Sequence, residues 1–239
     1  MNFPTRCILT LAYAWSAVAF GATAAAADIS KVLGSVRLEA GQTAEDVETV
    51  NGSVTIEASA RAGHVETVNG SITIEDRAFV ESAETVNGNV TIGAGSQVQG
   101  DVGTVNGDIT LRSGVRVGGA VANVNGEMRL EGATVGRGLE TVNADMHIGG
   151  GSRVAGGIHV ERNNGGEGWF DRMRKDERNP RIAVEQGAVV EGPLRFDREV
   201  DLYVADGVAL PPVVGVEPKR YPLQQRGLSP TYCLGDANR

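Results

Sequence analysis

Apolar residues recur along this chain at intervals of mostly 18 or 19 positions, and each repeat contains an apolar-x-apolar triplet such as Val54-Thr55-Ile56. Spacing by two places both apolar side chains on one face of a β-strand and turns the middle residue outward. The first triplet positions are Val36, Val54, Ile72, Val90, Ile109, Met128, Met146, Ile182 and Leu202. The second triplet positions are Leu38, Ile56, Ile74, Ile92, Leu111, Leu130, Ile148, Val184 and Val204.

Two further apolar columns complete each repeat. The third column is Ala44, Ala62, Val80, Val98, Val117, Val135, Val154, Val190 and Leu210, and the fourth is Val47, Val65, Ala83, Val102, Val121, Leu139, Ile158, Leu194 and Val214. A unit this short cannot enclose a core alone, so successive units must stack and bury these columns against one another. We therefore predict an all-β fold, a single-stranded parallel β-solenoid (β-helix) of about nine coils. Short strands and the usual handedness of parallel crossovers favour a roughly triangular, right-handed coil.

The tetrapeptide Thr-Val-Asn-Gly, or a close variant, marks one corner of each predicted coil. Its asparagines are Asn51, Asn69, Asn87, Asn106, Asn125 and Asn143. Identical amides stack into ladders in cross-β structures, so we predict a structural asparagine ladder, with Asn and Gly supplying the positive φ of a sharp corner. The threonine rows that begin at Thr49 and Thr55 are expected to stack in the same way. The alternative is a comb of amides that binds a regular polymer such as a glycan.

Residues 1–27 have the pattern of an export signal. Arg6 lies near the start, an apolar run extends from Ile8 through Phe20, and small residues end at Ala27. We expect this segment to be removed and the mature protein to lie in the periplasm, on the outer surface or outside the cell. No other apolar stretch is long enough to cross a bilayer, so we predict no transmembrane segment after signal removal.

The repeat, predicted over residues 28–214, is interrupted by an inserted loop at about 161–180. This insert holds an aromatic and cationic cluster that the coils lack, and inserts in solenoids often carry the binding function. The candidate partner-contact residues are Trp169, Phe170, Arg172, Met173, Arg174 and Lys175. The alternative is that the aromatic side chains fold back over the coils.

The two ends of the predicted stack differ. Residues 215–239 form a tail that contains Pro218, Pro222 and Pro230. Proline lacks the N–H that a further strand needs, so we expect this end to be blocked, whereas the first coil offers an open edge. Self-association through the N-terminal coil, as a head-to-head dimer, is the resulting hypothesis.

Charge and candidate chemistry argue for a non-catalytic role. The chain has 30 acidic and 22 basic residues and a net charge of -8, which disfavours binding to nucleic acid. His64, His147 and His159 have no ligand partners at metal-binding spacing. Outward acids such as Glu48 and Glu66 stack at repeat-related positions, which is typical of solubility rather than of a tuned catalytic pair. We expect no enzymatic activity, no cofactor and no metal site.

Two sets of units resemble known families. The segments from Gly151 to Ile158 and from Gly187 to Leu194 resemble the G-A-x-V-x-G-x-I coils of bactofilins, the bacterial polymer-forming cytoskeletal proteins. The unit from Thr67 to Ile74 is similar to the repeats of bacterial adhesin-type β-solenoid proteins. The bactofilin resemblance implies a right-handed triangular solenoid that assembles end to end. Neither resemblance supplies catalytic residues.

These features predict a non-catalytic, exported cell-envelope protein that acts as a rigid scaffold or adhesin-like surface and self-associates. Its partner would be an unidentified envelope protein or a glycan. The alternative is a carbohydrate-binding or carbohydrate-cleaving β-helix, for which acidic pairs should converge in a groove beside exposed aromatic residues.

Overall fold

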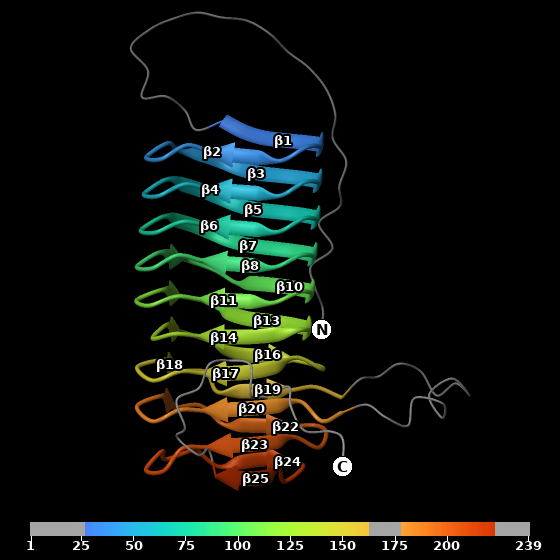
Figure 1. The fold of residues 1–239 in the computed structure, drawn as a ribbon, viewed down its shortest axis with the longest axis vertical. Coiled ribbons are helices and arrows are strands. Elements are labelled where there is room, and N and C mark those ends of the chain that lie inside the picture. The colour runs from blue at the N-terminus through green and yellow to red at the C-terminus, as the bar shows by residue number, and fades with distance from the viewer. Residues whose placement is uncertain (1–26, 163–177, 223–239) are drawn as a thin grey trace, which may run out of the picture.

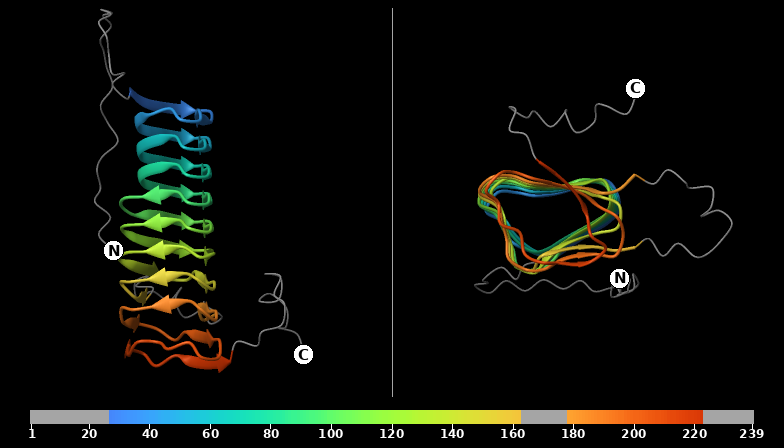
Figure 2. Two further views of the ribbon diagram at one scale, coloured as in Figure 1. Left: turned by 90° about the vertical axis from the view of Figure 1, so that its left-hand side faces the viewer. Right: turned by 90° about the horizontal axis from the view of Figure 1, so that it is seen from below.

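The computed structural model describes residues 27–162 and 178–222 as one stack of parallel β-strands (Figure 1). Each strand pairs with the equivalent strand of the next coil, and the pairing is parallel throughout the described residues. Viewed along the axis, the coils superimpose on one closed outline (Figure 2). The predicted parallel β-solenoid is therefore confirmed, with about ten turns rather than nine.

One face of the stack is a ten-stranded sheet, and the first nine of its strands contain the predicted apolar-x-apolar triplets. Its strands are β2 (Val36–Leu38), β4 (Val54–Ile56), β6 (Ile72–Ile74), β8 (Val90–Ile92), β11 (Ile109–Leu111), β14 (Glu127–Leu130), β17 (Asp145–Ile148), β20 (Arg181–Val184), β23 (Asp201–Val204) and β25 (Lys219–Pro222). At the strand spacing of about 4.8 Å, ten strands span roughly 45 Å. Both triplet columns pair residue by residue as predicted, from Val36 with Val54 to Ile182 with Leu202.

The other strands form a fifteen-stranded sheet that forks at β7. The undivided part contains β1 (Ala27–Leu33), β3 (Ala44–Asn51), β5 (Arg61–Asn69) and β7 (Phe79–Asn87). One branch contains β9 (Gln97–Val98), β12 (Arg116–Val117), β15 (Thr134–Val135), β18 (Arg153–Val154) and β21 (Val189–Val190). The other contains β10 (Val102–Asn106), β13 (Ala120–Asn125), β16 (Gly138–Thr141), β19 (Ile158–Val160), β22 (Leu194–Phe196) and β24 (Val213–Gly215).

The fork has a cause in the sequence. Two residues separate the third and fourth apolar columns between Val80 and Ala83, but three separate Val98 from Val102. With two intervening residues, a single strand carries both apolar positions on its inner face, and its alternation of inward and outward side chains is irregular only between them. The additional residue is accommodated by a bend at Gln99 and Gly100, so each of the next five coils has two separate strands here and three in all. Three strands per coil fit the triangular coil expected from the sequence.

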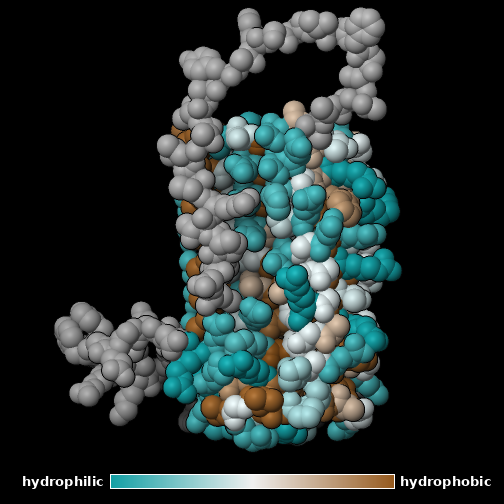
Figure 3. Space-filling view, turned by 180° about the vertical axis from the view of Figure 1, so that it is seen from behind, coloured by the Kyte–Doolittle hydropathy of each residue, from teal (hydrophilic) through white to brown (hydrophobic). Residues whose placement is uncertain are grey.

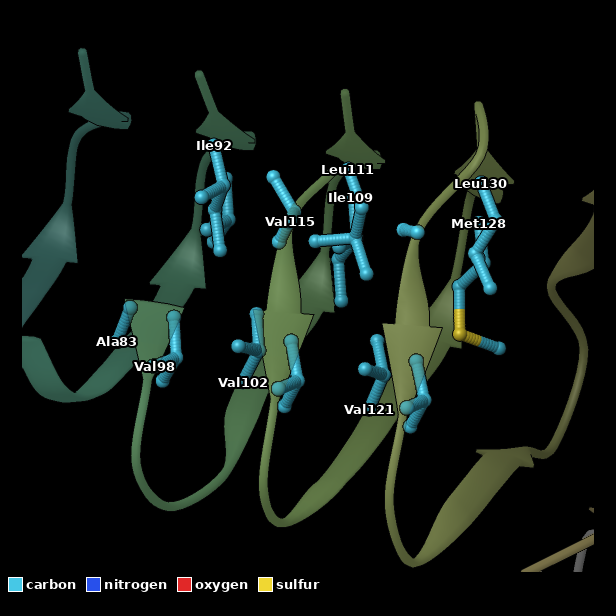
Figure 4. Close-up of a cluster of buried hydrophobic side chains, with 14 of the residues drawn as sticks. Ala83, Ile92, Val98, Val102, Ile109, Leu111, Val115, Val121, Met128 and Leu130 are labelled. Atoms are coloured by element: carbon cyan, nitrogen blue, oxygen red, sulfur yellow. The ribbon is translucent and has the colours of Figure 1, made fainter. Parts of the chain in front are cut away.

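The core is the continuous interior of the stack. The predicted columns are almost entirely buried, as shown for rows such as Ala83–Val102–Val121 and Ile92–Leu111–Leu130 (Figure 4). A fifth, narrower column completes the core, and the sequence prediction missed it because most of its members are small. These residues are Ala60, Ala78, Ser96, Val115, Ala133, Ser152 and Ala188. Uniform burial along the axis makes each coil depend on its two neighbours.

The C-terminal end of the stack departs from the prediction. Leu194 pairs with Val213 rather than with Val214, which pairs with Arg195 and is 52% exposed. The stack also continues beyond residue 214, because β25 pairs with β23. An apolar pattern could not reveal this strand, since Arg220 and Pro222 occupy its two triplet positions.

The N-terminal end also differs from the expected arrangement. Strand β1 begins at Ala27, the last residue of the predicted signal, and pairs with β3. Ile29 packs partly against the core, but the rest of β1 is exposed. This additional partial coil lies ahead of the first predicted one. The remainder of the predicted signal, residues 1–26, lies outside the described residues.

The Asn-Gly corners require glycine for a reason other than the predicted positive φ. Of these glycines, Gly52, Gly70, Gly88 and Gly107 do not adopt positive φ, whereas Gly126 does. A Cβ on Gly88 would lie 2.0 Å from the carbonyl oxygen of Gly70 in the preceding coil. Adjacent backbones approach so closely here that only a hydrogen atom fits between them. Positive φ is used instead at another corner, where Gly95 and Gly114 align with Ser59 and Arg77.

Threonine side chains fix the same corner from inside. In the row that begins at Thr49, each hydroxyl donates to a glycine carbonyl, as Thr104 Oγ1 does to Gly88 at 2.9 Å. Asn123 takes the next place in this row and donates from Nδ2 to the Gly107 carbonyl, but its buried Oδ1 has no partner within the described structure. The row is thus an inward hydrogen-bonding column rather than a ladder of contacts between threonines.

We predict that Gly88→Ala lowers the free energy of unfolding by about 3 kcal/mol, because the new methyl group would overlap a backbone atom that cannot move independently. Gly103→Ala is the matched control, since its nearest neighbour would be Glu84 Cγ at 3.8 Å. We expect this control to change stability by less than about 0.5 kcal/mol. Urea unfolding followed by circular dichroism measures both; equal losses would contradict the close-approach argument.

Candidate functional surface

The predicted partner-contact cluster from Trp169 to Lys175 lies outside the described residues, which exclude 163–177. The positions where the chain leaves and returns are described. Arg178 donates to Asp145 Oδ2 at 2.6 Å, and the backbone N–H of Arg181 donates to Asp145 Oδ1 at 2.8 Å. Strand β20 pairs directly with β17, so the stack continues across the insert without a missing coil.

The asparagine ladder forms with one polarity. Asn69 Nδ2 donates to Asn51 Oδ1 at 3.0 Å, and each later asparagine donates to the one before it. The remaining four links, at 3.0–3.1 Å, join Asn87, Asn106, Asn125 and Asn143 in the same way. Five bonds in series polarise one another and run parallel to the axis. The predicted ladder of hydrogen-bonded asparagine side chains is therefore present in the structure.

Arg198 closes the C-terminal end of the ladder. Its Nη1 donates to Asn143 Oδ1 at 2.7 Å and to the backbone carbonyl of Val142 at 3.3 Å. A guanidinium ion is a stronger donor than an amide, so the last acceptor of the series has a charge-assisted partner. Sequence reasoning missed this contact because 55 positions separate the two residues.

A column of stacked carboxylates runs beside the ladder on the outer face of the undivided strands. Glu48, Glu66 and Glu84 are aligned partners in consecutive coils. An outward row of valines, one from each Thr-Val-Asn unit, separates this column from the asparagines; Val86 is 40% exposed. The first coils therefore present an acidic surface with a partly apolar stripe. The valine row was missed because strand formation alone explains valine.

Stacking places each of these carboxylates in the electrostatic field of its neighbours. Burial, followed by the charge of Glu66, raises the pKa of Glu48 and of Glu84 above the usual glutamate value. Both groups are thus harder to ionise in the folded chain than in the unfolded chain. Their contribution to stability is present at low pH and is lost as the pH rises through their raised folded-state pKa values.

Each histidine has a carboxylate from a following coil within reach. His147 Nε2 lies 3.1 Å from Glu185, and His159 Nε2 lies 3.0 Å from Asp197 Oδ2. His64 Nδ1 lies 2.7 Å from the hydroxyl of Ser82, with Glu81 at 3.7 Å from Nε2. Spacing along the sequence did not reveal these pairs, because stacking joins residues one coil apart. Within the described ranges, no group of three or more such residues could hold a metal ion.

The two ends present different surfaces. On β1, Val32 and Leu33 are 70% and 75% exposed at the edge of the sheet. Figure 3 shows hydrophobic residues at the surface near the opposite end. An open depression of about 380 Å³ also lies at that end. Its lining residues are Val204, Val208, Leu210, Arg220, Tyr221 and Pro222. The rings of Tyr203 and Tyr221 stack there at a centroid distance of 5.0 Å.

Comparison of the chain with models of protein families, with curated proteins and with solved structures found no match. Among the described residues, the structure contains no helix that is long and apolar enough to cross a membrane.

We predict that Glu66→Gln raises the melting temperature at pH 7 and lowers the pKa values of Glu48 and Glu84 towards their usual range. The variant removes the carboxylate that faces both neighbours, so the gain in melting temperature should disappear near pH 3, where Glu48 and Glu84 are protonated because their pKa values are raised. Thermal melts at both pH values and a carboxyl carbon NMR titration measure these effects. Glu39→Gln removes an equal charge outside the column. An identical pH-dependent gain from that control would exclude stacking as the cause.

Proposed function

We propose that this chain is a non-catalytic, exported protein of the cell envelope that serves as a rigid scaffold or adhesin-like surface. The observation that carries the proposal is the continuous axial bonding of the stack. Backbone ladders, the asparagine ladder and the inward threonine row all run along one axis, so bending the rod would require many hydrogen bonds to lengthen together. Such an element holds its two ends at a constant separation.

The export part of the proposal rests on the segment that ends at Ala27. Its cationic start, apolar middle and small-residue end are what the export machinery and signal peptidase recognise. We also propose that the mature chain associates through β1, whose edge carries unpaired backbone groups and exposed Val32 and Leu33. Strand β25 ends at Pro222, which disfavours pairing at the other end. One open edge in each copy favours a closed two-fold dimer.

A second candidate, a carbohydrate-binding surface, is favoured by one observation. The stacked Tyr203 and Tyr221 side chains project from the outer face of the ten-stranded sheet near its C-terminal end. Aromatic rings beside polar residues are suited to sugar binding, because they combine a flat apolar surface with hydrogen-bonding groups. Loss of glycan binding in Tyr221→Ala, with unchanged oligomeric mass, would favour this candidate over the scaffold.

Cell fractionation tests the export proposal. We expect the chain outside the cytoplasm, with a new N-terminus close to Asp28, because signal peptidase cleaves after small residues. Replacing Ala25 and Ala27 with bulkier residues should cause the uncleaved precursor to accumulate. A chain that remains in the cytoplasm and keeps residues 1–27 would refute this part of the proposal.

Light scattering coupled to size exclusion tests the association. Two acidic N-terminal halves repel each other when they meet, so we expect dimerisation to strengthen as the salt concentration rises. The double variant Val32→Lys and Leu33→Lys should be monomeric, because charged residues at an edge oppose strand pairing. Val214→Lys places a charge at the other end and should leave the dimer intact. A monomer at every salt concentration, or a dimer lost only in Val214→Lys, would contradict pairing through β1.

A further inference from the structure

An open depression of about 440 Å³ lies beside the point where the chain leaves the stack after Arg162. Its lining residues are Arg162, Arg195, Phe196, Asp197, Gly215 and Val216. The backbone here is closely packed, since a Cβ on Gly215 would lie 2.2 Å from the carbonyl oxygen of Phe196. The depression is therefore bounded by a rigid part of the sheet, where β22 pairs with β19 and β24.

Asp197 holds both arginines of this depression. Its Oδ1 accepts from Arg195 Nε at 3.4 Å, and its backbone carbonyl accepts from Arg162 Nε at 3.2 Å. Its Oδ2 lies 3.0 Å from His159 Nε2. The hydrogen bond with His159, followed by that with Arg195, lowers the pKa of Asp197, so this carboxylate stays ionised. Both guanidinium groups are thus anchored at Nε by one residue, and both residues line the same depression.

The anchoring leaves the outer donors of both arginines available. A guanidinium group has five N–H donors, of which four lie on the two Nη atoms. Among the described residues, the hydrogen bonds of Arg162 and Arg195 use Nε alone. The Arg195 side chain is 60% exposed. The neighbouring carboxylates already have partners, since Asp197 holds the arginines and Glu161 lies 3.9 Å from His159 Nδ1.

We propose that Arg162 and Arg195 form a binding site for an oxyanion, a carboxylate or phosphate group carried by another molecule. The planar fork of Nη donors matches two oxygens of such a group, and two forks that line one depression can share one anion. Anchoring at Nε reduces the side-chain entropy that binding would otherwise cost. The site is independent of the proposed scaffold role and of association through β1.

Arginine side-chain NMR tests the site in the purified protein. Inorganic phosphate and acetate are titrated separately, with ionic strength held constant by sodium chloride. We expect saturable shifts of the Arg162 and Arg195 Nε–H signals. Arg195→Gln should weaken binding about tenfold, because one fork is lost. Arg195→Lys keeps the charge without the fork and should also weaken binding, which a purely electrostatic effect would not produce.

Arg116→Gln is the matched control, because it removes the same charge from an exposed strand position in β12. This variant should leave the affinities for phosphate and for acetate unchanged. Sedimentation with phosphatidylglycerol vesicles separates the sources: binding that depends on Arg195 identifies a lipid phosphate, and binding of free anions without vesicle binding identifies a soluble one. Chemical shifts that do not saturate, or a loss of anion affinity in Arg116→Gln equal to that in Arg195→Gln, would overturn the proposal. Circular dichroism of each variant verifies that it remains folded.

Discussion

The close, in-register approach of each coil to the next determines the rest of this structure. Parallel strands separated by about 4.8 Å bring every side chain directly over its counterpart in the repeat. Each column must then consist of residues whose side chains can lie against identical side chains at little energetic cost. Valine and isoleucine do so by packing, asparagine by hydrogen bonding, and glycine by the absence of a side chain. Glutamate does so only at an energetic cost, because burial and then the charge of Glu66 raise the pKa values of Glu48 and Glu84.

The fold could be predicted from the sequence because burial and repetition give the same signal here. The triplet columns, the stacking of residues one repeat apart and the asparagine ladder all follow from spacing alone. The ends could not be predicted in this way, because they are not buried on both sides. Arg220 and Pro222 replace apolar residues in β25, and most of β1 is exposed. The reason for the Asn-Gly glycines was also hidden, since a sequence does not show how closely two backbones approach.

The candidate functional surfaces are harder to predict from the sequence than the fold. The predicted contact at Trp169 and its neighbours rests on their unusual composition, and composition alone gives no geometry. By contrast, the cluster around Asp197 consists of residues that are unremarkable in the sequence and meet only because β22 stacks on β19. Extending the apolar alignment to the polar positions would have placed His159 over Arg195. The contacts of Arg162 and Arg198 depend on side-chain reach, which an alignment of columns does not contain.

The fork at β7 has a consequence for how the chain finds its native state. The coils built around β3 and β5 are so alike that a folding chain could pair one with the wrong neighbour, skipping a whole unit and leaving it as a loop. Most buried contacts would survive such an error, so hydrophobic burial discriminates poorly against it. The additional residue at Gly100 breaks this equivalence, because a coil with three strands does not match one with two. An irregularity of a single residue thus distinguishes the first coils from the later ones and opposes mispairing across the boundary between them.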